Sequence, residues 1–414
     1  MLDRVALAHR YARVRARTEA LASRLSAEDA MVQSMPDASP AKWHLAHTTW
    51  FFDEFVLAAS GHPRWHDERW RVLFNSYYDA VGPRHPRTAR GVLSRPSLEE
   101  VRAWRARVDE EVLAVVPHAD PALLRNVLLG THHEEQHQEL LLTDVKHALS
   151  CSELRPAYVD GRTPSTGAAP PLAWLTREHR TVPVGHDERD AGGFAFDNEG
   201  PRHPVIVGPF GLASRLVTNG EYAAFVHDGG YTRPELWLSD GWAAVQESGW
   251  TAPLYWERAH DGWRVFGMRG LEPLDLDAPA AHVSYYEADA YARWAGARLP
   301  TEEEWESVAR AVPVEGNFLD DGRLAPCAPP PGDGPHQLFG DAWEWTASAY
   351  LPYPRFRPLE GPLGEYNGKF MSGQMVLRGG SCFSPREHLR ATYRNFFSPA
   401  ARWQMTGIRL ARDA

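Results

Sequence analysis

Apolar residues recur at helical spacing through residues 1–150 of the chain, and this periodicity then stops. Apolar positions repeated every three or four residues are typical of amphipathic helices. The periodic stretches cover residues 5–25, 42–59, 101–116 and 123–149. Ser97 opens a capping-box pattern before the third stretch, and Pro121 is a typical first residue for the fourth. The pattern predicts an up-and-down four-helix bundle.

The rest of the chain has a different character. Residues 162–171 are rich in Pro, Gly, Ser and Thr, which is typical of a linker. From about residue 181, Gly, Pro, Trp and short strand-like runs dominate, and helical spacing returns mainly at 219–228 and 285–295. The chain is therefore predicted to be an α+β protein. Its expected parts are a helical bundle at 1–155, a linker at 156–180 and a mixed α+β domain at 181–414.

Composition excludes several classes of partner. The formal net charge of the 414 residues is -10, and no block of Lys or Arg stands out, which argues against nucleic acid and anionic membranes as partners. No apolar run reaches membrane-spanning length, and the first residues lack the apolar core of a signal peptide. Three cysteines far apart make no disulfide framework. A reducing cytoplasm is the expected compartment.

Two histidines in the fourth periodic stretch point to metal chemistry. His133 and His137 are four residues apart, so on a helix their imidazoles share one face and can bind one ion. His47, in the second stretch, can supply a third ligand from a neighbouring helix. The residues between the pair do not make the His-Glu-x-x-His pattern of zinc proteases. A polar helix face carrying solvated histidines is the alternative interpretation.

The spacing leaves the metal open. Three neutral imidazoles suit Fe(II) that reacts with O2, as a relative of the facial triad, and they equally suit catalytic zinc. His44 and His132 lie close to these ligands in the sequence and are expected beside the metal ligands or at the surface. Residues 69–95, rich in Pro, Gly and aromatics, form a connection too long for a simple turn and are expected to be functional.

That connection carries candidate polar groups. Tyr77 and Tyr78 offer phenols that can supply a proton, although from the residues alone aromatic packing of a loop explains them better. Arg84, Arg87 and Arg90 follow at three-residue intervals, and one of them can clamp a carboxylate.

Taken together, these motifs resemble a known family. Residues 35–52 and 133–139 resemble the two signatures of the ergothioneine-type sulfoxide synthases, iron enzymes that join a thiol to the imidazole of trimethylhistidine (hercynine). The second half resembles the formylglycine-generating-enzyme fold through residues 283–288, 297–302, 340–345 and 378–381. The resemblance covers nearly the whole chain. It implies a DinB-like four-helix bundle followed by a formylglycine-generating-enzyme-like (C-type-lectin-like) α+β domain.

The resemblance also implies roles for individual residues. His47, His133 and His137 match the ligands of the Fe(II) cofactor. Tyr77 and Tyr78 match a tyrosine pair that acts as proton donor in one branch of the family. The residues that match substrate-binding positions are Gln136 and Asn395 for trimethylhistidine, and Arg87, Phe396 and Phe397 for the thiol. The expected partners are therefore trimethylhistidine, a thiol and O2.

Departures from the family pattern keep the donor open. This chain has Ser372-Gly373 and Phe383-Ser384 where common members carry other residues, so a selenosugar donor, as in the sister group of selenoneine synthases, is as well supported as a thiol. A copper-dependent formylglycine-generating activity needs two nearby cysteines, and only Cys382 lies between Ser381 and Asn395. A zinc-dependent thiol transferase and a non-catalytic metal- or ligand-binding module are the alternative functions.

Overall fold

The protein, analysed as a computed structural model, folds into two compact units. The structure describes residues 2–63, 66–164, 167–187, 193–260, 262–332 and 334–414. The helical unit comprises Met1–Val159, Gly192–Phe194 and Leu359–Tyr366. The second unit comprises Asp160–Ala191, Ala195–Pro358 and Asn367–Ala414.

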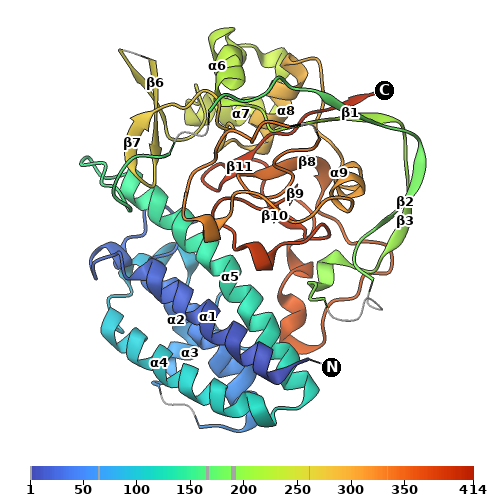
Figure 1. Cartoon of the computed structure of the whole chain (residues 1–414). Coiled ribbons are helices and arrows are strands. Elements are labelled where there is room, and N and C mark those ends of the chain that lie inside the picture. The colour runs from blue at the N-terminus through green and yellow to red at the C-terminus, as the bar shows by residue number, and fades with distance from the viewer. Residues whose placement is uncertain (1, 64–65, 165–166, 188–192, 261, 333) are drawn as a thin grey trace. The chain divides into compact units, whose positions relative to one another are not determined.

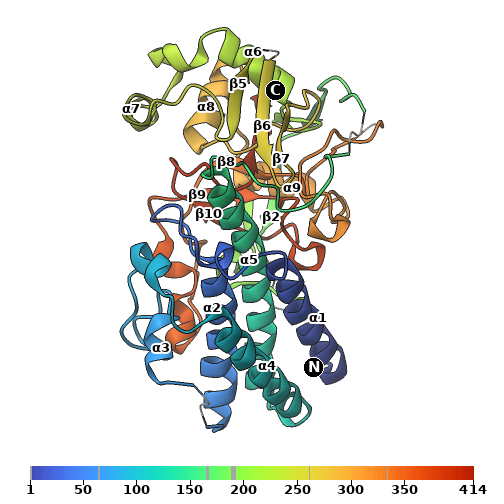
Figure 2. The same cartoon turned by 90° about the vertical axis from the view of Figure 1, so that its left-hand side faces the viewer.

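Among the described residues, four long helices form the core of the helical unit, and they can be followed in Figures 1 and 2. Its helices are α1 (Arg4–Ala22), α2 (Ala41–Phe52), α3 (Arg69–Leu73), α4 (Leu98–Val115) and α5 (Pro121–Ser150). The central pair, α2 and α5, pack against each other, while α1 contacts α5 and α4 contacts α2. The predicted capping box is present, because the Ser97 side chain accepts from the Glu100 N–H and Glu100 accepts from the Ser97 N–H. Asp120 caps α5 just before Pro121.

The second predicted helix is not regular to its end. The α-helical hydrogen bonds of α2 stop at Phe52, and one turn of π-helix follows at Asp53–Leu57, then a 3₁₀ turn at Ala58–Ser60. A π-turn widens the helix by one residue and is often found at functional sites. The Asp53 carboxylate on this turn accepts a hydrogen bond from Trp104 at 3.2 Å, and its Oδ2 lies 2.8 Å from the Nε2 of His66. These contacts tie the end of the second helix to α4 and to the connection that follows.

The described residues of the second unit form four small sheets. The strand order is β1-β4-β12 in one, β10-β9-β8-β11 in the largest, β2-β3 in a third and β5-β6-β7 in a fourth. The bounds are β1 (Trp174–Arg177), β2 (Arg180–Val184), β3 (His203–Val207), β4 (Phe210–Ala213), β5 (Trp256–Ala259), β6 (Gly262–Gly267), β7 (Gly270–Pro273), β8 (Trp343–Ala349), β9 (Met375–Arg378), β10 (Asn395–Phe397), β11 (Thr406–Gly407) and β12 (Ala411–Asp413). Strand β1 lies within the segment expected to be a linker, of which residues 165–166 are outside the described residues.

The described part of the second unit also has α-helices: α6 (Asn219–His227), α7 (Ser239–Ser248), α8 (Tyr285–Trp294) and α9 (Glu302–Ala309). Thr218, Ser284 and Thr301 each form a capping box at the start of α6, α8 and α9. Trp305 of α9 and Trp345 of β8 are fully buried, which places the core between this helix and the largest sheet. None of the described helices combines the length and the apolar character needed to cross a bilayer.

Candidate metal centre

Three buried imidazoles converge inside the helical unit. His47 lies on α2, and His133 and His137 lie one turn apart on α5. Their exposed fractions are 0%, 1% and 8%, and one potential ligand atom from each lies within 4.8 Å of the others. The Nε2 atoms of His47 and His133 are 3.2 Å apart. Two nitrogens bound to one ion at about 2.0–2.1 Å, as in zinc sites, are separated by a similar distance.

Glu134, which lies between the two histidines in the sequence, pairs with residues of other helices. Glu134 accepts from Arg15 at 2.9 Å and from Thr18 at 2.6 Å, and it also pairs with Arg105. Burial would raise the pKa of Glu134, but Arg105 and Arg15 lower it to about 2. This carboxylate is therefore committed to the ion network that joins α5 to α1 and α4.

Aromatic side chains enclose the histidine cluster. The His47 ring is stacked between Trp43 and Trp50, with centroid distances of 4.6 and 5.6 Å. Phe51 lies against His133 at 4.6 Å. Burial in these surroundings lowers the pKa of His133 to about 3, and burial together with neighbouring His133 lowers those of His47 and His137 well below the ordinary value. The imidazoles are therefore neutral at pH 7, which is the form that binds metals.

The donor set fits a divalent transition metal. The Nδ1 of His47 lies 2.6 Å from the Phe74 carbonyl, which can only accept, so Nδ1 carries the proton and Nε2 carries the lone pair. His133 Nδ1 has no hydrogen-bond partner among the described residues, which leaves its Nε2 as the atom facing His47. Neutral imidazole is a ligand for iron, zinc and copper alike, so this donor set does not choose among them.

The predicted tyrosine pair lies close to these aromatics. Tyr77 and Tyr78 stack at 4.7 Å, and the Tyr78 ring is 5.6 Å from Trp50. Tyr78 is fully buried, and burial, followed by the influence of Tyr77, raises its pKa well above the ordinary value. The Tyr78 phenol therefore keeps its proton at neutral pH.

A third phenol reaches the cluster from a distant part of the sequence. Tyr366 belongs to the Leu359–Tyr366 segment of the helical unit, and its ring lies 5.6 Å from His133 and 6.3 Å from Tyr77. Its hydroxyl donates to the side-chain oxygen of Gln136. Gln136 thus contacts a phenol beside the candidate ligands. No local pattern in the sequence identifies Tyr366, because 230 residues separate it from Gln136.

The arginines of the connection differ in burial. Arg87 is exposed and donates to the main-chain carbonyl of Asp37. Arg90 is only 3% exposed, and its guanidinium lies 3.4 Å from the Trp43 ring centroid. It donates to the hydroxyls of Ser39 and Ser76, at 2.8 and 3.3 Å, and its Nε has no hydrogen-bond partner among the described residues. Burial, and then Arg87, lower the pKa of Arg90 to about 9.

The remaining predicted substrate residues lie on β10 in the second unit. Phe396 stacks on Tyr350 at 4.0 Å, and Phe397 meets Trp403 edge-on at 5.8 Å. The Asn395 side-chain oxygen accepts from the Phe396 N–H. The structure places most of the predicted site residues in the helical unit: His47, His133, His137, Tyr77, Tyr78, Gln136 and Arg87. It places the others in the second unit: Asn395, Phe396 and Phe397.

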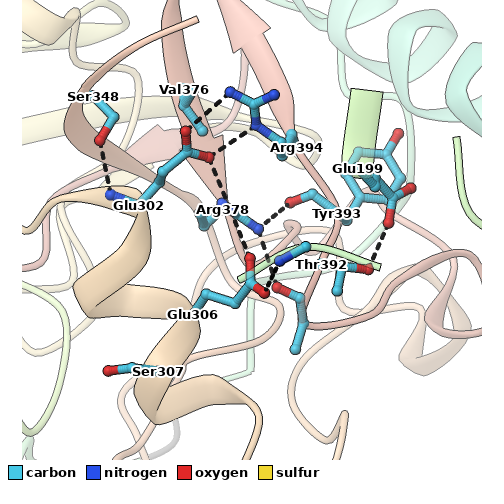
Figure 3. Close-up of polar contacts among 12 residues, drawn as sticks. Glu199, Glu302, Glu306, Ser307, Ser348, Val376, Arg378, Thr392, Tyr393 and Arg394 are labelled. Atoms are coloured by element: carbon cyan, nitrogen blue, oxygen red, sulfur yellow. Dashed lines mark hydrogen bonds and ion pairs between the residues drawn. The ribbon is translucent and has the colours of Figure 1, made fainter. Parts of the chain in front are cut away.

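A buried ion network holds the segment that leads into β10 (Figure 3). Glu302 accepts two hydrogen bonds from Arg394, both at 2.9 Å, and one from Arg378 at 2.8 Å. Burial would raise the pKa of Glu302, but Arg394 and Arg378 lower it. Arg378 also donates to the carbonyls of Ala391 and Tyr393, at 3.1 Å each. The network fixes the backbone immediately before Asn395.

The positions that depart from the family pattern also lie in the second unit. Ser372 and Gly373 have φ of 77° and 76°, so they form a turn with two successive left-handed residues. Phe383 and Ser384 are completely buried, and Ser384 accepts from the Ser381 N–H at 2.9 Å. The second pair therefore acts through packing, while the first sets a turn.

Two protein-family models match the chain, one over its helical part and one over its mixed α+β part. Residues 10–147 match the DinB superfamily, and residues 175–332 and 327–414 match the sulfatase-modifying factor enzyme 1-like domain. These matches confirm the predicted α+β fold class, with its DinB-like helices and its formylglycine-generating-enzyme-like domain.

Relatives extend over the full chain. The chain is 34% identical to "Hercynine oxygenase" of Mycolicibacterium smegmatis, over 100% of both chains, and 34% identical to "Hercynine oxygenase" of Mycobacterium tuberculosis, over 98% of both. It is 30% identical to "Ergothioneine biosynthesis protein 1" of Schizosaccharomyces pombe, over 53% of this chain and 28% of that protein. With its helical unit, its mixed second unit and these full-length relatives, the chain belongs to the hercynine oxygenase family of oxidoreductases.

Proposed function

We propose that this chain is a mononuclear non-heme Fe(II) enzyme that uses O2 to form a chalcogen–carbon bond on the imidazole of trimethylhistidine. The observation that carries the proposal is the buried cluster of His47, His133 and His137. The full-length similarity to hercynine oxygenases supports the substrate, because hercynine is trimethylhistidine. Three cysteines that lie far apart in the sequence support a reducing compartment, the cytoplasm.

The reaction balances with O2 as the only oxidant. The donor loses its S–H or Se–H hydrogen, and the imidazole loses the hydrogen on the carbon between its two nitrogens. One oxygen atom ends on the chalcogen and the other leaves as water. Bound at the three histidines, Fe(II) supplies the redox chemistry that activates O2. The aromatic wall of Trp43, Trp50 and Phe51 keeps bulk water from the cluster, since all three side chains are buried.

The protein's own residues handle the substrates and the proton. A trimethylammonium group has no proton to donate, so aromatic faces and oxygen dipoles suit it, and Gln136 offers such an oxygen beside the cluster. Asn395 remains proposed for the same substrate through the family resemblance. The proton donor is proposed to be one of Tyr77, Tyr78 and Tyr366, and Tyr366 has the most direct support because it contacts Gln136 and faces His133.

The donor is either a thiol or a selenosugar. An amino-acid or peptide thiol carries a carboxylate, and the connection provides Arg87 at the surface and Arg90 in a buried position with no carboxylate hydrogen-bonded to it among the described residues. A selenosugar has no carboxylate and depends more on aromatic contacts, for which Phe396 and Phe397 are proposed. The departures from the family pattern at Ser372-Gly373 and Phe383-Ser384 keep both donors open.

An aerobic assay tests this proposal. Iron-loaded protein is incubated with trimethylhistidine and, in turn, cysteine, γ-glutamylcysteine and a selenosugar, and the products are read by mass spectrometry. The proposal predicts an O2-dependent product that joins the donor to trimethylhistidine. No coupled product with any donor, or equal product with zinc in place of iron, contradicts it and favours the zinc-dependent transferase or the binding module.

A further inference from the structure

A fourth buried histidine touches one of the candidate ligands. His44, on α2, is 2% exposed, and its Nδ1 lies 2.9 Å from the Nδ1 of His137. Its other nitrogen, Nε2, lies 3.0 Å from the Oδ2 of Asp144. Asp144 is 5% exposed and also accepts from the Ser39 N–H at 2.8 Å. These contacts make a continuous chain from Ser39 through Asp144 and His44 to His137.

The contacts determine where the protons of this chain lie. The Asp144 carboxylate can only accept, so His44 donates through Nε2–H. A neutral His44 then has a lone pair on Nδ1, and the facing Nδ1 of His137 must carry a hydrogen to bond with it. The lone pair of His137 is therefore on Nε2. This is the nitrogen that remains for the metal.

The other two ligands are supported differently. His47 donates through Nδ1 to a neutral carbonyl, that of Phe74, while His133 Nδ1 has no hydrogen-bond partner among the described residues. Among the contacts of the described residues, His137 alone of the three ligands is hydrogen-bonded to an imidazole, that of His44, which is itself bonded to a carboxylate. A metal-bound histidine whose second N–H is held by a carboxylate-linked partner is fixed in orientation and becomes a stronger donor.

We propose that His44 and Asp144 are positioning residues that fix the tautomer and orientation of His137 and thereby set the metal affinity of the site. The inference deepens the proposed function, since it concerns the same three-histidine site. It is tested by metal binding alone, so a failed activity assay would leave it standing, and a failure here would leave the reaction class standing.

The contact between His44 and Asp144 connects the two central helices, α2 and α5. His44 is three residues before His47 on α2, and Asp144 is seven residues after His137 on α5, so each lies near the face that carries a ligand. Asp144 also lines a surface cavity with Ser34, Val145 and Leu149. Substitutions at Asp144 thus have space beside them, which favours folded variants.

The test measures the affinity of purified protein for Co(II) and Zn(II) by competition with a chelator. His44→Phe removes the acceptor for His137 N–H, and affinity is expected to fall by about 10–100-fold, the usual effect of losing such a partner. His44→Gln offers an amide oxygen to the same N–H and is expected to recover most of the loss. The further substitution Asp144→Leu in the His44→Phe variant is expected to lower the metal affinity little more, because Asp144 acts on His137 through His44. The Co(II) absorption spectrum of His44→Phe should also differ from that of the wild type.

His147→Gln is the matched control. His147 lies one turn beyond Asp144 on α5 and ten residues after His137, and its Nδ1 lies 2.6 Å from the Ser34 hydroxyl, so its loss is expected to leave metal affinity within about twofold. If His44→Phe does not fold without metal, Asp144→Asn carries the test, with an expected loss near tenfold. Wild-type affinity in His44→Phe or in Asp144→Asn overturns the proposal. Independent, multiplicative losses in the double variant overturn it as well, because they assign the two residues to separate roles.

Discussion

Three phenols lie near the histidine cluster, and they differ in their contacts. Tyr366 donates to Gln136 and faces His133, whereas Tyr77 and Tyr78 stack on each other. We expect Tyr366→Phe to shift the product from coupling toward simple oxidation of the donor, because it removes the proton and keeps the ring. Mass analysis of the two products from each single variant measures the shift.

The same assay on Tyr77→Phe and Tyr78→Phe provides the comparison. A larger shift in either of these variants moves the role to the predicted pair. Unchanged product ratios in all three variants contradict a phenolic proton donor.

A substitution at Arg90 can distinguish a thiol donor that carries a carboxylate from a selenosugar donor. Arg90→Met removes the buried charge and keeps a flexible apolar chain against Trp43. With γ-glutamylcysteine, loss of the charge-assisted contact is expected to cost about 1.5–3 kcal/mol of donor binding. With a selenosugar the cost should be smaller, because this donor has no carboxylate. Steady-state KM values for both donors in wild type, Arg87→Met and Arg90→Met measure the difference.

Equal losses for every donor in the Arg90 variant would mean that Arg90 stabilises the fold around Trp43 and does not bind the donor. A larger donor-specific loss in Arg87→Met would assign the carboxylate to the exposed arginine that the family resemblance implies.

Single side chains were predictable where local spacing carries the information. Four-residue spacing placed His133 and His137 on one helix face, and the structure puts His47 beside them. His44 was expected beside the ligands or at the surface, and it is buried against His137. Tyr366 carries no such signal, because only tertiary folding brings it to the cluster. The difference in burial between Arg87 and Arg90 is also a tertiary effect, set by packing on Trp43.

The ion network between α1, α4 and α5 predicts a pH-dependent contribution to stability. The folded pKa of Glu134 is about 2, below its ordinary value of 4.5, so its stabilising contribution is fully present above pH 4.5 and is lost as the pH falls toward 2. The shift corresponds to about 3 kcal/mol. Glu134→Gln should therefore lower the unfolding free energy by about 3–5 kcal/mol at pH 7.

Chemical denaturation of wild type and Glu134→Gln between pH 7 and pH 3 tests this network. The difference between the two proteins should narrow below pH 4.5, because the Glu134 carboxyl then takes up a proton in the unfolded chain while it stays charged in the folded one. Glu110→Gln, a change at the surface of α4, is the control and should show no such dependence. A constant difference across this range would contradict the assigned charge of Glu134.

Helices were more predictable than strands. The four long helices of the bundle and α6, α8 and α9 follow from apolar spacing and capping residues. The π-turn at Asp53–Leu57 was not predicted, because its contacts with Trp104 and His66 come from tertiary packing. The short helices α3 and α7 were missed, and β1 lies where a linker was expected. Strands of three to five residues leave too few positions for an alternating pattern.

The order of segments along the sequence does not predict which unit each segment joins. Leu359–Tyr366 follows the second half of the chain in sequence yet belongs to the helical unit, where Glu365 accepts from the N–H groups of Asp79 and Ala80 at 3.0 and 2.8 Å. Division by composition alone assigned this segment to the second domain. Such long-range pairing depends on the folded chain as a whole.

Metal binding should stabilise the folded protein by mass action. Metal at about 100 times its dissociation constant adds about 2.7 kcal/mol to the unfolding free energy. Thermal unfolding of metal-free protein, with and without added Zn(II), measures this gain, and His137→Ala should lose it. An equal gain in wild type and His137→Ala would place the metal elsewhere.

The most direct test of the account is the iron content of anaerobically purified protein. Wild type is predicted to hold one iron per chain when reconstituted with Fe(II), and His47→Ala, His133→Ala and His137→Ala should each be strongly depleted and inactive in coupling. His118→Ala, which changes an exposed histidine in the 3₁₀ turn Val116–His118 that follows α4, should keep its iron. Full iron occupancy in all three ligand variants would contradict the three-histidine site and the function derived from it.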